Sequence, residues 1–449
     1  MQVSASTVSA EPSIKSGLPA LSESRFARFA TILLLYFMQG VPLGLSLIAV
    51  PAWLAANGAT PVIVGAFVGT ALLPWSLKLF NGLVMDRFTF KPMGRRRSWI
   101  LAAQSGMVLT FFALAVASPS AAEVGSLTAF FFILNLCAVF NDVAVDGMTV
   151  DIVPNEERTA INGLMFASQS VGIAATSFLG GQFLASSQMS ALAFTVAAGV
   201  GLASLMVSVC RERPGERLLP WSVGHASAEC EARQQGAWWP LLKGVFAAVT
   251  KPLTLLFLVG IGLGSAGWSF LDAVAPTLAV QVVGWSSEQY SSYASLVSLI
   301  AALTAAVATP VLVKLFGLRR VIIALFITSA AIFAIAGATF DPNVDGRIVA
   351  IIFAAQYVLS LLLVIAAIVW AMRICDPAVA ASLFALFMAV PNFSRGVLSG
   401  LSGFAVESVG YGGFYLLVAA VMMVGLVFCL LGRVGDEQAA ARILDNQNA

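Results

Sequence analysis

Long apolar stretches alternate with short polar ones along nearly the whole chain. A helix needs about 20 mainly apolar residues to cross a bilayer, and twelve stretches reach that length. They fall at 29–55, 61–85, 98–118, 125–151, 159–184, 190–209, 252–280, 289–315, 321–340, 347–374, 381–406 and 411–432. The pattern predicts an all-α polytopic membrane protein with twelve transmembrane helices in two pseudo-symmetric six-helix bundles.

The longest polar interruption separates the sixth stretch from the seventh. We therefore expect a cytoplasmic N-terminal segment at 1–28, an N-terminal bundle at 29–209 and a cytoplasmic central loop at 210–251. A C-terminal bundle at 252–432 and a cytoplasmic tail at 433–449 complete the chain. Within the central loop, the Trp and Lys spacing of 237–251 predicts an amphipathic helix lying on the inner leaflet.

The two halves repeat each other at corresponding loops. A shift of 223 residues places Gly94 on Gly317, Arg96 on Arg319, Arg97 on Arg320 and Pro154 on Pro377. Two parallel six-helix halves are typical of transporters whose substrate site lies at the membrane midplane between them.

Composition and charge agree with a membrane protein and orient it. Hydrophobic residues make up 59% of the chain, charged residues 10%, and the mean hydropathy is +0.92, whereas soluble chains carry roughly 25% charged residues. Of the 24 Lys and Arg residues, only Arg347 falls in an outer loop. The positive-inside rule therefore places both termini in the cytoplasm of a bacterial-type inner membrane. Residues 1–24 lack the apolar core of a cleavable signal peptide.

Several signals argue against other classes of protein. The five cysteines form no C-x-x-C pair or metal-ligand spacing, and His225 has no catalytic neighbour. The stretch GLGSAG at 262–267 lies inside an apolar span, so close helix packing explains it better than a nucleotide site. We expect no catalytic site, metal, cofactor or nucleic acid, and a monomer whose partners are the lipid bilayer, a small-molecule substrate and protons.

Three ionisable residues lie within two neighbouring spans, where each charge is costly. Counting 1.5 Å per residue, Lys78 and Asp146 each lie roughly 12 Å from the inner face. Asp142 lies one turn deeper on the same helix face as Asp146, and Asp151 lies near the interface within reach of water. One Lys cannot neutralise both Asp142 and Asp146, and a surplus buried carboxylate tends to take up a proton. A proton-coupling site and a static charge-paired triad are both consistent with this pattern.

The second half contains its own polar positions within spans. Arg395 lies near the midplane, where its guanidinium fork suits an anionic substrate group or an ion pair with an Asp of the facing half. Trp268 and Asp272 lie one turn apart on the seventh span, with Asp272 nearer the outer face. In the first span Gln39 precedes Gly40 and Pro42, which predict a break in the helix at a substrate cavity; the alternative for Gln39 is an interhelical hydrogen bond.

Four stretches together resemble a known family. They are YFMQGVPLGL (36–45), LPWSLKLFNGLVMDR (73–87), GRRRSW (94–99) and NDVAVDGMTVDIVPNEER (141–158). They resemble the major facilitator superfamily, and within it the branch of muropeptide permeases of the AmpG type and acetyl-CoA transporters, which includes siderophore importers of the RhtX and FptX kind. After the second Asp this chain reads GMTV where muropeptide permeases typically carry an aromatic residue and a Lys, so the resemblance implies the branch and leaves the substrate open.

The resemblance implies roles for particular residues. In that branch a Lys on the second helix and a D-x-x-x-D on the fourth recur, which match Lys78, Asp142 and Asp146. The superfamily's signature loop implies a gate in which a Gly allows close helix approach and an acid and a basic cluster form a charge network. The matching residues are Gly82, Asp86, Arg87, Gly94, Arg95, Arg96 and Arg97.

These observations favour a secondary active transporter that imports a medium-sized polar or anionic solute with protons, resembling a muropeptide permease. Gln39, Arg395, Trp268 and Asp272 are the candidate substrate contacts. The alternative within the same branch is a siderophore or chelate importer. Alternatives from other classes are a passive facilitator, a sensor or an intramembrane enzyme, of which the first two need no titratable surplus acid.

Overall fold

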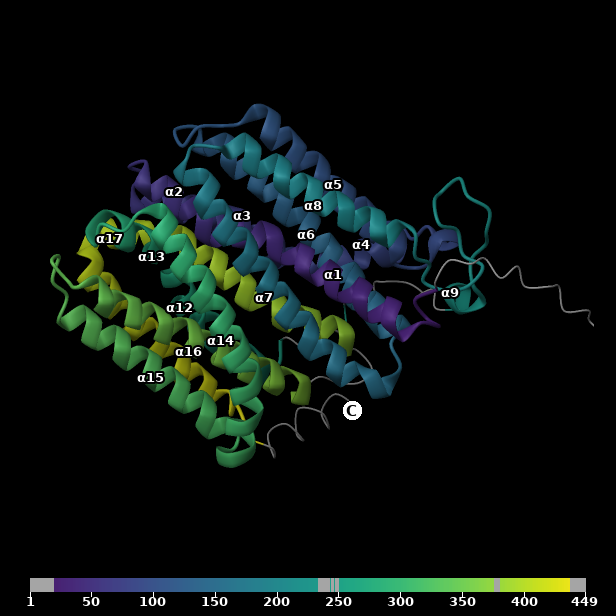
Figure 1. Ribbon diagram of the computed structural model, residues 1–449. Coiled ribbons are helices and arrows are strands. Elements are labelled where there is room, and N and C mark those ends of the chain that lie inside the picture. The colour runs from purple at the N-terminus through teal and green to yellow at the C-terminus, as the bar shows by residue number, and fades with distance from the viewer. Residues whose placement is uncertain (1–19, 233–242, 244–245, 247–249, 375–379, 437–449) are drawn as a thin grey trace, which may run out of the picture.

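A computed structural model of the chain describes residues 20–232, 243, 246, 250–374 and 380–436. Long helices run side by side in two groups (Figure 1). The purple-to-teal first half forms one group and the green-to-yellow second half forms the other. The segment expected to form an amphipathic helix, 237–251, lies largely outside the described residues.

The described helices of the first half follow one another along the chain. They are α1 (Arg25–Gly44), the π-helical η1 (Leu45–Ala49), α2 (Val50–Ala56), α3 (Pro61–Leu72), the 3₁₀-helical η2 (Leu73–Leu77), α4 (Lys78–Arg87), η3 (Lys91–Met93), α5 (Arg97–Ala117), α6 (Val124–Ile152), α7 (Asn155–Ala185), α8 (Met189–Ser208) and the short α9 (Ala228–Ala232).

The second half follows after the central loop. Its helices are α11 (Pro252–Gly264), α12 (Ala266–Ser269), the π-helical η4 (Phe270–Val274), α13 (Ala275–Thr277), the π-helical η5 (Leu278–Val282), α14 (Ser287–Phe316), α15 (Leu318–Ala338), α16 (Gly346–Ile374) and α17 (Ala380–Leu431).

The described helices account for twelve membrane spans. Nine are long and apolar enough to cross a bilayer, and α3, η2 and α4 form a tenth that is bent. The long α17 contains two spans, because Gly410 interrupts it with a φ of 71° and a ψ of 174°. The twelfth is α7, which has 31 residues but carries more polar side chains. The expected twelve-helix fold is therefore confirmed, and the helix ends lie within a few residues of the expected spans.

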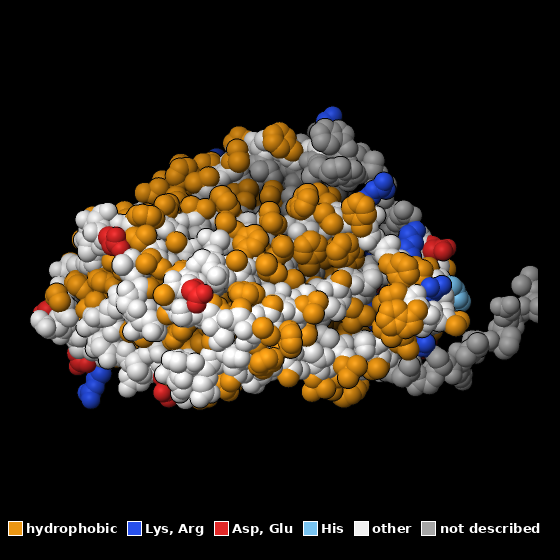
Figure 2. All heavy atoms as spheres, turned by 90° about the horizontal axis from the view of Figure 1, so that it is seen from above, with side chains coloured by type: hydrophobic (Ala, Val, Ile, Leu, Met, Phe, Trp, Pro, Cys, Tyr) orange, Lys and Arg blue, Asp and Glu red, His pale blue; other side chains and the backbone are white. Residues whose placement is uncertain are grey.

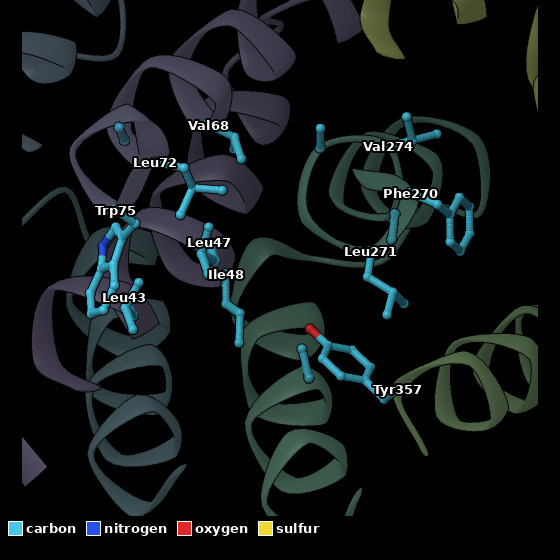
Figure 3. Packing of buried hydrophobic residues seen from close by; sticks show 14 of the residues in the cluster. Leu43, Leu47, Ile48, Val68, Leu72, Trp75, Phe270, Leu271, Val274 and Tyr357 are labelled. Carbon is cyan, nitrogen blue, oxygen red and sulfur yellow. The ribbon is translucent and has the colours of Figure 1, made fainter. Parts of the chain in front are cut away.

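The two groups of helices contact each other through close backbone packing. Helix α3 packs against α17, and α7 packs against α14. At Gly69 of α3 a Cβ atom would lie only 2.7 Å from the carbonyl oxygen of Gly396 on α17, so a side chain has no room there. Figure 3 shows buried side chains from both halves, such as Ile48 and Leu271, in one apolar cluster.

Hydrogen bonds between the two halves lie near one end of the molecule. Gln281 Nε2, in η5, donates to the carbonyls of Ala55 at 2.9 Å and Ala59 at 2.8 Å. The hydroxyls of Ser177 and Ser295 are 2.7 Å apart between α7 and α14. Within the described ranges these are the side-chain hydrogen bonds that join the halves, and they lie away from the arginine-rich loop that precedes α5.

The surface separates into an apolar belt and a basic end. Figure 2 shows side chains of hydrophobic type over most of one face, with Lys and Arg gathered mainly toward the end that carries α9. Large exposed hydrophobic side chains such as Leu205, Val307 and Ile351 belong to this belt. Exposed apolar surface of this extent indicates contact with lipid.

Candidate transport site

An ion pair joins the second and fourth spans. Lys78 begins α4 and places its Nζ 2.5 Å from Oδ2 of Asp142 on α6. The ammonium also lies 5.2 Å from the centre of the Trp75 ring, within the range of a cation–π interaction. Asp142 is only 3% exposed, so its charge depends on Lys78 for compensation.

Asp146 does not share this ion pair. It lies one turn after Asp142 on α6, is exposed, and accepts a hydrogen bond from the hydroxyl of Tyr36 on α1. Among the described residues no cation lies within ion-pair distance of it. Sequence counting placed Lys78 level with Asp146, but counting along a helix does not give the direction of a side chain. Lys78 is the first residue of α4, directly after the 3₁₀ turn η2, and its ammonium reaches Asp142, one turn from Asp146. The expected triad is therefore a pair plus a separate acid.

Tyr36 is the residue that sequence reasoning missed beside Asp146. It is 5% exposed and lies in α1, three residues before Gln39. A buried Tyr in an apolar span generally needs a partner for its hydroxyl group. That rule could have singled out Tyr36, although it could not have named Asp146 as the partner.

Several polar side chains around the ion pair form hydrogen bonds with one another. Trp75 Nε1 donates to Asn135 Oδ1 at 2.9 Å, and Asn135 Nδ2 donates to Ser46 Oγ at 2.9 Å. Gln104 Nε2 donates to Asn141 Oδ1 at 3.1 Å. These bonds attach α6 to η1, η2 and α5, because buried polar groups in a membrane are costly unless paired. They fix the helix that carries both Asp residues.

A second charged cluster lies in the C-terminal half. Arg395 of α17 binds Asp272 of η4 with both arms of its fork, at 2.5 Å from Nε and 2.8 Å from Nη2. The Arg395 guanidinium carbon lies 4.4 Å from the centre of the Trp268 ring. Trp268 in turn packs edge-on against Tyr357 with ring centres 6.1 Å apart. The expected ion pair of Arg395 exists, but its Asp belongs to the same half and not to the facing half.

Gln39 lies apart from this cluster. It is fully buried in α1 and accepts a hydrogen bond of 3.0 Å from Gln169 Nε2 of α7, so the interhelical alternative is realised. Its own Nε2 has no partner among the described residues. The helix is not broken at Gly40 and Pro42 as expected; it continues to Gly44 and then widens into the π-helical η1. Gly40 instead allows α1 to touch the backbone of α7.

The loop between the second and third spans forms a charge network. Asp86 Oδ1 lies 2.9 Å from Arg95 Nη2 and 2.7 Å from Arg96 Nη2. Arg95 also lies 3.5 Å from Oδ2 of Asp151, at the end of α6. The side chain of Asp151 is only 6% exposed, so the expectation that it reaches water is wrong. Arg95 covers it.

Glu212 of the central loop completes this network and was not expected from the sequence. Its carboxylate accepts from the backbone N–H groups of Arg95 at 2.9 Å, Arg96 at 2.7 Å and Arg97 at 2.5 Å. Burial raises the pKa of Glu212, while the three N–H donors oppose the shift. Gly94 has a φ of 94°, and a Cβ there would lie 2.7 Å from the Glu212 carboxyl group.

Gly82 and Arg87, two other members of the expected gate, take no part in the charge network or in a close helix contact among the described residues. A Cβ at Gly82 would meet only Val143 at an ordinary 3.8 Å, so close approach does not require this glycine. Arg87 is exposed and forms no ion pair with another described residue. The glycine without room for a side chain on the fourth span is Gly147, where Arg96 passes within 2.5 Å of the Cβ position.

Comparison with known proteins agrees with this architecture. The sequence profile of the Major Facilitator Superfamily matches residues 32–312. The anhydromuropeptide permease of Escherichia coli (strain K12) is 24% identical over 440 residues, covering 93% of this chain and 82% of that protein. Putative transporter AmpG 4 of Rickettsia felis is 28% identical over 155 residues, covering 33% of this chain and 36% of that protein.

Solved structures show the same fold. The nucleoside transporter NupG matches with a TM-score of 0.68 and 14% identity, covering 90% of this chain and 98% of that one. These relatives are transporters and permeases, which confirms the prediction of a membrane transporter and not an enzyme. Because the family profile covers more than half of the sequence, the chain belongs to the major facilitator superfamily.

Proposed function

We propose that the protein imports a medium-sized polar or anionic solute of the muropeptide type together with protons. The solute class is supported by the Escherichia coli relative, which is named an anhydromuropeptide permease and is similar over 93% of this chain. Proton coupling is supported by the arrangement of Asp142, Lys78 and Asp146.

The observation that carries the coupling proposal is the separate position of Asp146. Lys78 compensates Asp142, so Asp146 keeps only the Tyr36 hydroxyl as a described partner and is exposed. A carboxylate that has no cation beside it takes up a proton readily when water is excluded from its surroundings, because desolvation favours the neutral form. In the proposed cycle Asp146 takes up a proton in the outward-facing state and releases it to the cytoplasm when water reaches it from that side.

The packing of the two halves supports an inward-open state for this structure. The halves are hydrogen-bonded near Gln281 and Ser177, away from the arginine-rich loop. We assign that closed end to the periplasm, with both termini in the cytoplasm of the inner membrane, because Lys and Arg gather at the other end. In this proposal the bundles 29–209 and 252–432 of a monomer rock against each other.

The solute is proposed to bind near Arg395. A guanidinium fork suits a carboxylate or phosphate, and in this structure the Asp272 carboxylate occupies it. An anionic solute group would compete with Asp272 for Arg395, while its apolar part would lie against Trp268. Gln39 has a buried amide donor without a described partner, which is available to a polar solute when α1 moves.

The alternative functions differ from this proposal either in the solute or in the need for a titratable Asp146. A siderophore or chelate importer would use the same fold and an anion-binding Arg395, and would differ only in its solute. A passive facilitator or a sensor would not need a titratable Asp146. The function test is uptake of a radiolabelled anhydromuropeptide by proteoliposomes with and without an inward proton gradient. Accumulation only with the gradient supports the proposal, whereas equal uptake in both conditions contradicts coupling and no uptake contradicts the solute class.

A further inference from the structure

A cavity of about 290 Å³ lies at the basic end of the C-terminal half. It is bordered by the end of α14, the start of α15, the end of α16 and the segment after α17. The described residues that line it include three arginines and no acid; they are Val313, Phe316, Gly317, Leu318, Arg319, Arg320, Arg373 and Gly435.

The corresponding loop of the N-terminal half shows how a cluster of arginines at this position is neutralised. Gly94 and Gly317 correspond under the internal repeat, and both have a positive φ, of 94° and 80°. The arginines that follow correspond as well. In the first half Arg96 faces Asp86, while the backbone of the whole arginine run is bound by Glu212. Carboxylates of the chain itself therefore compensate the first cluster.

The second half has none of these acids at the corresponding positions. The same shift of 223 residues places Asp86 on Thr309, Asp151 on Ile374 and Glu212 on Gly435. Gly435 lines the cavity, and a Cβ there would lie 2.6 Å from the backbone of Arg319, so no side chain fits. Asp436 follows Gly435 but is not among the lining residues.

The cavity therefore presents positive charge that the described part of the chain does not neutralise. Arg319 and Arg320 are exposed, and neither forms an ion pair with another described residue. Arg373 has a further polar contact, so the charge surplus rests on the first two. Arginine forks at such a site favour a phosphate group.

The surroundings of the cavity indicate a lipid as the source of that phosphate. Leu315 is 67% exposed, Phe316 is 55% exposed and Met372 is 63% exposed, and all three line the cavity or adjoin residues that do. A molecule with an anionic headgroup and acyl chains would satisfy both the arginines and this apolar rim.

We propose that the cavity binds the headgroup of an anionic phospholipid, which takes the place that Glu212 and Asp86 occupy in the first half. The inner leaflet as the source of that lipid follows from the orientation proposed above. Binding would hold the cytoplasmic ends of α14, α15 and α16 together, as the carboxylates hold the ends of α4, α5 and α6.

The test uses the purified full chain in detergent and does not depend on transport. Native mass spectrometry titrates phosphatidylglycerol, phosphatidylcholine and soluble glycerol 3-phosphate against wild type and an Arg319→Gln/Arg320→Gln double variant. Arg347→Gln, at the opposite end of the same half, is the matched control for loss of an exposed Arg. Thermal unfolding without lipid shows whether each variant is folded.

We expect phosphatidylglycerol to bind wild type and the control variant more tightly than phosphatidylcholine. With each Arg worth about 1 kcal/mol near an anionic lipid, the double variant should bind about 30-fold more weakly. Equal binding of phosphatidylglycerol by wild type and a folded double variant would overturn the proposal. Glycerol 3-phosphate binding as tightly as the lipid would also overturn it, because the site would then belong to a soluble anion. Should the double variant fail to fold, the single variants Arg319→Gln and Arg320→Gln must each weaken phosphatidylglycerol binding.

Discussion

Lys78 Nζ lies 2.5 Å from Asp142 Oδ2, and this pairing leaves Asp146, one turn away, without a cation at ion-pair distance among the described residues. Two carboxylates that look equivalent in the sequence therefore have different surroundings. Asp142 is buried and depends on its partner, whereas Asp146 is exposed and binds a neutral hydroxyl group. We assign helix packing to the first and proton exchange to the second.

The difference between the two acids should appear in stability. Asp142→Asn leaves the buried Lys78 charge without its partner and should lower the free energy of unfolding by about 3–5 kcal/mol. Asp146→Asn leaves the ion pair intact and should unfold near the wild-type temperature. Fluorescence-detected thermal unfolding in detergent compares the two, and equal destabilisation would mean that both acids share Lys78.

Alanine should be tolerated at Gly82 of α4 but not at Gly94 of the arginine-rich loop. Gly94→Ala forces a positive φ on a residue with a side chain and drives a Cβ into Glu212, which should cost about 1–3 kcal/mol. Gly82→Ala is the matched control, because its Cβ meets only Val143 at 3.8 Å. The midpoint of thermal unfolding measures both, and a Gly94→Ala midpoint equal to that of Gly82→Ala would contradict the geometry.

The central loop should be less stable at higher pH because of Glu216. Burial, followed by the charge of Glu212, raises the pKa of Glu216 to about 7 from its usual 4.5. The folded state therefore binds more protons than the unfolded state between these values, so this contribution is present below pH 4.5 and is lost as the pH rises through 7. The loss is about 1–3 kcal/mol.

Glu216→Gln keeps the shape of the side chain and removes its titration. Limited proteolysis of the central loop at about pH 5.5 and about pH 8, on either side of the raised pKa, should show faster cleavage of wild type at the higher pH, corrected for protease activity on an unfolded peptide. The variant should be cleaved at nearly equal rates at both values. A variant with the wild-type pH response would show that another group is responsible.

Arg395 should discriminate between its two proposed partners, solute and Asp272. Arg395→Lys keeps a charge for Asp272 but loses the fork, so solute affinity should fall roughly tenfold with the loss of one charge-assisted hydrogen bond. Folded protein should remain near the wild-type level. Binding of an anhydromuropeptide is measured by scintillation proximity, with Arg347→Lys as the control. Unchanged affinity would limit Arg395 to its structural ion pair.

Membrane orientation gives a further prediction. Single cysteines placed at Ser120 and Ser187, in a variant without native cysteines, should react in intact cells with a reagent that cannot cross the membrane. A cysteine at Ala226 in the central loop should react only after the cells are opened. Labelling of Ala226 in intact cells would invert the proposed topology.

The sequence was sufficient for the spans because lipid demands long apolar runs with every backbone group satisfied. It also singled out Lys78, Asp142, Asp146 and Arg395, since charges in a membrane are few. It could not give their pairing. The bend at η2 and the π-helical turns η1 and η4 shift side chains along and around their helices, and these distortions leave no clear periodic signal.

Glu212 was beyond sequence reasoning for a different reason. It lies in a polar loop among other charged residues, where an acidic residue is common and does not indicate a buried contact. Only the fold reveals that this one is buried against the start of α5 and binds three backbone N–H groups. Asp272 was singled out by the sequence, but its contact with Arg395 joins two helices distant in the sequence and appears only in the fold.

The most direct test of the coupling proposal is proton-driven accumulation against solute exchange for Asp146→Asn in proteoliposomes, with Glu229→Gln as the control for an exposed acid of the central loop. Exchange of labelled for unlabelled anhydromuropeptide need not move a net proton, so Asp146→Asn should retain it. Accumulation on an imposed pH gradient needs the titrating carboxylate and should fall to the level of protein-free liposomes. Wild-type accumulation by Asp146→Asn would contradict the central claim that Asp146 carries the coupled proton.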